Sequence, residues 1–109
     1  MFVVLHQDSP TSAKYQLKKL IKDVKEHHHP YWNYDEFNTN EPCIYYRAYQ
    51  YYLDRSVVFR ASVKKNTIIF EPVHYAGCSE LFDIEHNVIK LVSFLLNNCY
   101  EEGVSIQIV

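Results

Sequence analysis

The residues best suited to chemistry lie close together between His27 and Tyr52. Three consecutive histidines, His27 to His29, precede most of the ten tyrosines and the single tryptophan of this 109-residue chain. Histidine nitrogens bind transition metals, whereas tyrosine, tryptophan and arginine dominate the binding energy of protein interfaces. This segment therefore suggests either a metal site or a docking surface, and its folding decides between them.

The histidine run is weak evidence for a metal site. Zinc requires three or four convergent ligands, but adjacent histidines at a helix end point in different directions. A site would need a further ligand from His6, His74 or His86, which lie elsewhere in the sequence. Histidine near a helix C-terminus also suits the helix dipole without any metal. We therefore expect no metal and no cofactor, and keep a metal-dependent enzyme using this cluster as an alternative.

No pattern typical of a catalytic site accompanies these residues. The chain has only two glycines, Gly77 and Gly103, and no glycine-rich phosphate-binding motif. No serine lies in a nucleophile elbow. The cysteines (Cys43, Cys78 and Cys99) are odd in number and lack paired spacing, as expected of small core residues in a reducing, cytoplasmic setting. We expect no catalytic residues.

The tyrosine-rich segment predicts a docking surface if residues 43–53 form one strand. Side chains alternate along a strand, so the odd-numbered residues from Tyr45 to Tyr51 would share one face. Ile44 and Ala48 mark the other face as the one that packs on helices. The aromatic residues of the preceding loop would either fill the core or reach a partner. The expected partner-binding residues are Tyr31, Trp32, Tyr34, Tyr45, Arg47, Tyr49, Tyr51 and Arg60.

Two functions compete for this surface. In the first, a non-catalytic domain docks on a protein partner, and an inhibitor or immunity-type protein is its concrete form. In the second, the tyrosines stack on nucleic-acid bases while the arginines meet phosphates. The net charge of −2 and a pI near 6.3 favour the protein partner. The same surface could instead join two copies of the chain as a homodimer.

Charge is segregated along the chain although its total is near zero. Residues 10–26 sum to +3 and residues 71–102 sum to −5. Four lysines repeat at helical spacing, either as a solvated face or as contacts for phosphates: Lys14, Lys18, Lys22 and Lys25. No segment reaches the roughly 18 apolar residues of a membrane span, so no membrane contact is expected.

Hydrophobic periodicity predicts the elements that position these residues. The apolar run from Phe2 to Leu5 is typical of a buried strand, and Ser9-Pro10 predicts the start of a helix over residues 10–27. Residues 43–53, 57–63 and 67–73 predict three strands joined by turns, after a long loop from Pro30 to Pro42. Ser79 predicts the cap of a second helix, whose apolar stripe is widened by Phe82, Ile89 and Leu96. Gly103 predicts the end of this helix, and Val104 to Val109 predict a last strand.

The predicted order is β-α-β-β-β-α-β within a single α+β domain of residues 1–109. Strands joined by tight turns pair antiparallel, and each helix has one apolar stripe that must be buried. We therefore expect a two-layer sandwich. It would consist of a mostly antiparallel four- to five-stranded sheet with two helices on one face.

Overall fold

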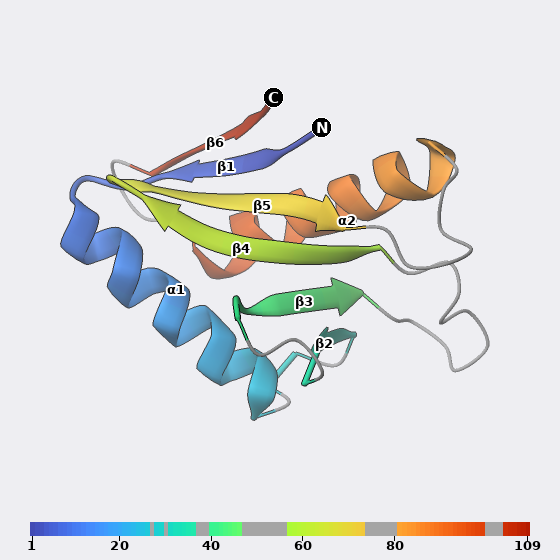
Figure 1. Cartoon of the computed structure of the whole chain (residues 1–109), viewed down its shortest axis with the longest axis horizontal. Helices are drawn as coiled ribbons and strands as arrows, with labels where there is room; N and C mark the ends of the chain where they lie inside the picture. The colour runs from blue at the N-terminus through green and yellow to red at the C-terminus, as the bar shows by residue number, and fades with distance from the viewer. Residues whose placement is uncertain (27, 30, 37–39, 47–56, 74–80, 100–103) are drawn as a thin grey trace.

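The computed structural model describes residues 1–26, 28–29, 31–36, 40–46, 57–73, 81–99 and 104–109 (Figure 1). Among them are helices α1 (Pro10–Lys25) and α2 (Leu81–Asn98), and strands β1 (Val3–His6), β2 (Trp32–Tyr34), β3 (Cys43–Tyr46), β4 (Val58–Lys64), β5 (Thr67–Val73) and β6 (Ser105–Ile108). All neighbouring strands are antiparallel, in the order β2-β3-β4-β5-β1-β6. The α+β two-layer prediction is confirmed, with six strands instead of four to five.

Helix α1 begins where the sequence predicts because Ser9 caps it. The Ser9 hydroxyl accepts a hydrogen bond from the backbone N–H of Ser12, with 3.1 Å between N and Oγ, and Pro10 lies in the first turn. The apolar stripe is buried except at Leu17, which is half-buried, and the lysines of the helix are exposed. The helix ends at Lys25, two residues before the predicted end.

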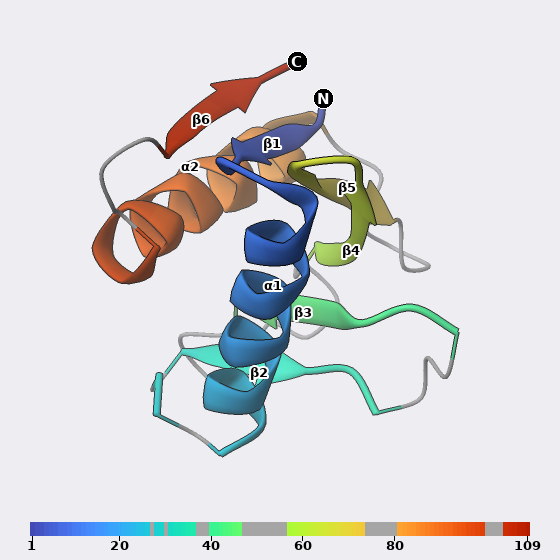
Figure 2. The same cartoon turned by 90° about the vertical axis from the view of Figure 1, so that its left-hand side faces the viewer.

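One face of the sheet is apolar, and both helices cover it. The strand register places Leu5 opposite Ile68, which is itself opposite Val63. These side chains join one core cluster with the buried residues of both helices. The sheet curves around α1 and α2 in Figure 2. The helices meet where the Gln16 amide donates a hydrogen bond to the Sγ atom of Cys99, at 3.3 Å.

Strand β2 lies in the segment that we expected to be a loop, so that prediction was wrong for residues 32–34. Trp32 pairs with Tyr46 of β3, and its side chain is 5% exposed. The indole stacks on Phe94 of α2 with 4.9 Å between ring centroids, and it also contacts Phe59. A three-residue strand is too short to show periodicity, so the pattern could not reveal it.

Helix α2 is less buried than its sequence predicts. Its main stripe is buried at Val88, Leu91 and Leu95, but Ile89 is 65% exposed and Leu96 is 47% exposed. The expected widening of the stripe was therefore wrong at these two residues. The described residues do not include the predicted cap Ser79, the predicted helix end Gly103 or residues 47–53 of the predicted strand 43–53. The side chain of Phe82 also lies outside the described part of the chain. In the part of the chain that the structure describes, neither helix is long and apolar enough to cross a membrane.

Replacing Trp32 with alanine tests its structural role. We expect Trp32→Ala to lower the free energy of unfolding by about 3–5 kcal/mol, because it empties a closed aromatic site between β2 and α2. Tyr31→Ala is the matched control: its ring is 48% exposed, and its loss should cost less than about 1 kcal/mol. Urea denaturation measures both values. Equal effects would contradict the assignment of Trp32 to the core.

Candidate functional site

The predicted tyrosine stripe begins on the open face of the sheet, opposite the helices. Ile44 is fully buried on the helix side, whereas Tyr45 is half-buried on the open side, as the alternation predicts. Cys43 lies opposite Arg60 in the register, so Arg60 shares the face of Tyr45. The remaining stripe residues, Arg47, Tyr49 and Tyr51, lie outside the described residues.

Arg60 is already paired with two carboxylates. Its Nη2 atom donates to Oε2 of Glu71 at 2.7 Å, and its Nε atom lies 3.3 Å from Oε2 of Glu41. The hydrogen bond that the guanidinium donates to Glu71 raises the pKa of Arg60 above its ordinary value. Glu71 is also the cross-strand neighbour of Arg60, so the sheet holds this pair together. A phosphate or partner carboxylate would have to compete with both acids for this side chain.

The three aromatic residues of the predicted loop have different environments. Trp32 fills the core and is not accessible to a partner. Of the two roles that the sequence left open for it, core packing and partner binding, the structure shows the first. Tyr31 is exposed and packs against Tyr46 at 5.7 Å between ring centroids. Tyr34 is half-buried, with Nζ of Lys25 lying 4.4 Å from its ring centroid as a cation–π pair. These residues do not form one surface.

A groove beside helix α1 was missed by the sequence analysis. It has a volume of about 900 Å³ and lies between α1 and residues of β2, β4 and the segment before β3. Leu17 and Ile21 of the helix face Val63 and Pro42 across it, which makes much of the lining apolar. Tyr15 and Tyr34 add aromatic rings to the lining. An apolar groove with a few polar groups is the common form of a binding site.

The charged lining of the groove is mostly positive. Four of its residues are lysines from one face of α1: Lys14, Lys18, Lys22 and Lys25. At 1.5 Å of rise per residue, this row is about 16 Å long. Within the described residues, no carboxylate forms an ion pair with Lys14, Lys18 or Lys22. The lysine spacing was visible in the sequence, but the opposite wall comes from residues that only folding brings close.

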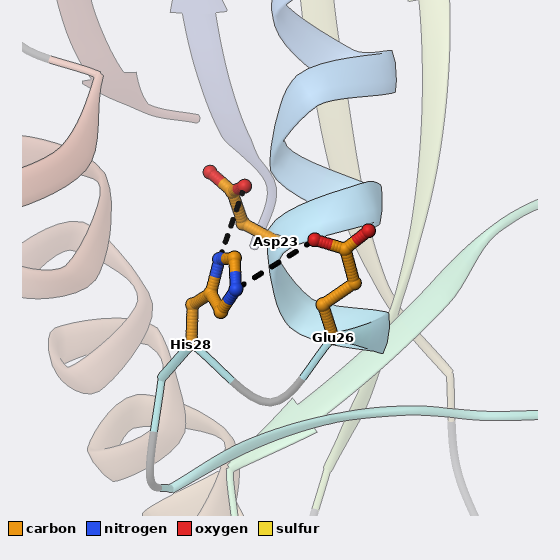
Figure 3. Close-up of side chains that lie close together, drawn as sticks. All are labelled: Asp23, Glu26 and His28. Atoms are coloured by element: carbon orange, nitrogen blue, oxygen red, sulfur yellow. Dashed lines mark ion pairs between the residues drawn. The ribbon is translucent and has the colours of Figure 1, made fainter.

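Of the histidine run, His28 lies beside two acids at the end of α1. In Figure 3, His28 lies between two acids, with Nδ1 3.6 Å from Oδ1 of Asp23 and Nε2 3.6 Å from Oε2 of Glu26. One ligand atom of each residue lies within 4.8 Å of the others, but each carboxylate contacts a different ring nitrogen. The two ring nitrogens of His28 point in different directions, so one metal ion could bind only one of them and replace only one of the two contacts. His29 instead packs edge-on against Phe94 at 4.8 Å.

The described cysteines do not resemble catalytic nucleophiles. Cys43 and Cys99 are buried, and Cys43 is a free thiol. Burial raises the pKa of the Cys43 thiol above 9.0, and the nearby charge of Asp35 raises it further. The thiolate is the reactive form, so a raised pKa keeps Cys43 unreactive at neutral pH. Cys78 and His74 lie outside the described residues.

The raised pKa of Cys43 predicts a loss of stability at alkaline pH. The unfolded thiol has the ordinary pKa of cysteine, while the raised pKa of the folded thiol retains the proton to higher pH. The unfolded state is therefore favoured as pH rises above that value. We expect the free energy of unfolding to fall less between about pH 8 and about pH 10 in Cys43→Ala than in the natural sequence. Urea denaturation at both pH values measures the difference, and identical slopes would contradict it.

Comparison with known proteins matches no family model, no curated protein and no solved structure. Any assignment of function therefore rests on the groove, the open sheet face and the residues themselves.

Proposed function

We propose that this protein is a small non-catalytic domain that binds an acidic segment of a protein partner in the groove beside α1. The observation that carries the proposal is the row of Lys14, Lys18 and Lys22 above an apolar lining. No described carboxylate forms an ion pair with these lysines. A row of like charge attracts and orients a segment of opposite charge, and the apolar lining can bury a side chain of that segment.

The spacing of the lysines matches common peptide geometries. Successive lysines four residues apart are separated by about 6 Å along the helix axis. Acidic residues on one face of a helical or extended segment recur at about 6–7 Å. A partner with acids at this spacing could pair with two or three lysines and place an apolar residue against Leu17 and Ile21. Tyr15, which is 68% exposed, supplies an aromatic anchor of the kind that dominates interfaces.

The described residues favour a protein ligand over a nucleic acid. The open sheet face, where bases would stack, has its arginine Arg60 paired with Glu41 and Glu71. In the groove, the ammonium group of Lys25 lies over the ring of Tyr34, so a base has less room to stack on that ring. The chain as a whole carries a net charge of −2, which repels a polyanion outside the groove. The lysine row is therefore better suited to a short acidic segment.

An inhibitor or immunity-type protein is the concrete form of this proposal. Such a protein acts by covering the surface of its partner, and it needs no catalytic group. The protonated state of Cys43 supports a role without nucleophilic chemistry. The free, buried thiol of Cys43 also supports a reducing, cytoplasmic setting.

Charge reversal within α1 tests the groove. We expect Lys18→Glu to weaken binding of a fluorescent peptide of alternating glutamate and leucine by about tenfold, because an attraction becomes a repulsion. Lys19→Glu is the matched control, since Lys19 is the exposed neighbour of Lys18 but does not line the groove. It should change the affinity by less than about threefold. Fluorescence polarisation at low salt measures both.

Two outcomes would contradict the proposal. Equal losses in the two variants would show a general charge effect without a groove. Tighter binding of a single-stranded oligonucleotide than of the peptide, lost in Lys18→Glu, would instead support the nucleic-acid alternative. Its affinity should then fall steeply as salt rises.

A further inference from the structure

Exposed apolar side chains gather at the β6 edge of the molecule. In the described part of the chain, eight large hydrophobic residues are exposed, and two of them, Tyr15 and Tyr31, lie at or near α1. Four of the others belong to the ends of the chain, which lie beside each other next to β1 and β6 in Figure 1. The remaining two lie on α2. These six residues are Met1, Phe2, Ile89, Leu96, Ile108 and Val109.

The exposed apolar residues of α2 lie on the flank that faces β6. Ile89 and Leu96 are seven residues apart and therefore share one side of the helix. Phe94 projects from the opposite side and stacks on Trp32 of β2, at the other edge of the sheet. The flank of Ile89 and Leu96 is therefore directed toward the β6 edge, and Figure 2 shows α2 beneath β6. A further strand beside β6 would cover these two side chains.

The outer edge of β6 presents backbone groups for such a strand. Phe2 and Val109 exchange two backbone hydrogen bonds, at 2.7 and 2.8 Å. Hydrogen-bonded pairs alternate along an antiparallel ladder, so the N–H and C=O groups of Ile106 and Ile108 point away from β1. β6 is the last strand of the sheet. The side chains of Ile106 and Ile108 lie on the helix side, because they are opposite the buried Leu5 and Val3.

We propose that β6 pairs with β6 of a second copy of this chain, about a two-fold axis that passes through Gln107. Ile106 then lies opposite Ile108 of the second copy, and these two pairs supply four backbone hydrogen bonds. The six-stranded sheets join into one continuous sheet. The isoleucines of each copy cover Ile89 and Leu96 of the other.

Charge and side-chain pattern identify a second copy as the occupant. A strand that covers this edge must bring apolar side chains to the helix side, and β6 itself does so with Ile106 and Ile108. A residue on a two-fold axis faces its own counterpart, so a charge there would repel itself. Gln107 is neutral, and β6 contains no charged residue from Ser105 to Ile108. The basic groove beside α1, by contrast, selects a partner of opposite charge.

Disulfide trapping tests the register. The residues at the axis form a non-hydrogen-bonded pair with Cα atoms about 4.5 Å apart, which a disulfide can span. We expect Gln107→Cys, in a chain that also carries Cys78→Ser, to form a covalent dimer under mild oxidation. Ser105→Cys in the same background is the matched control, because the proposed register separates the two copies of residue 105 by about 13 Å. Equal cross-linking of both variants would overturn the proposal.

Sedimentation equilibrium tests the association itself. The natural chain should have twice its 13.0 kDa mass at about 100 µM. Leu96→Lys should raise the dimer dissociation constant about a hundredfold. The substitution occurs twice in a two-fold dimer, and each occurrence should weaken the affinity about tenfold. Tyr15→Lys, at an exposed aromatic position outside the edge, should leave the mass unchanged. A monomeric natural chain at this concentration would overturn the proposal. Lys18→Glu should not alter the mass, so failure of the groove is distinguishable from failure of the dimer.

Discussion

The register of the β4–β5 hairpin determines most of the remaining structure. It places Ala61 opposite Phe70 on the helix side and Arg60 opposite Glu71 on the open side. A slip of β5 by one residue would move Phe70 to the open side and Glu71 to the helix side, so the phenylalanine would be exposed and the glutamate buried away from Arg60. Because the register is held, one face of the sheet is apolar throughout, and both helices have a single surface on which to bury their stripes.

The position of β2 follows from that apolar face and creates the groove. Trp32 fills the space beside Phe94, which fixes the short strand β2 against β3. Tyr34 is then held next to Lys25, close to the end of α1. The groove lies between α1 and the residues Tyr34, Pro42 and Val63. The apolar stripe of α1 faces the sheet, so the neighbouring face of the helix, which carries the lysines, lines the groove.

Part of the candidate site could be predicted from the sequence. The lysine spacing on α1 and the opposite orientations of Ile44 and Tyr45 follow from helix and strand periodicity. The pairing of Arg60 could not be predicted, because Glu41 and Glu71 are 19 and 11 residues away in the sequence. The core position of Trp32 could not be predicted either, because tryptophan is common both in protein cores and at interfaces. The exposure of Ile89 and Leu96 depends on where α2 lies relative to β6.

The sequence by itself determined both described helices, the hairpin, the α+β class and the apolar side of strands β3 to β6. These features depend on local geometry, because side chains on one face recur every 3.6 residues in a helix and every 2 residues in a strand. Only the tertiary structure decided the strand order, the pairing of Arg60, the groove wall opposite the lysines and the position of β6 at one edge of the described sheet. Each of these depends on contacts between residues far apart in the chain, and no local period encodes them.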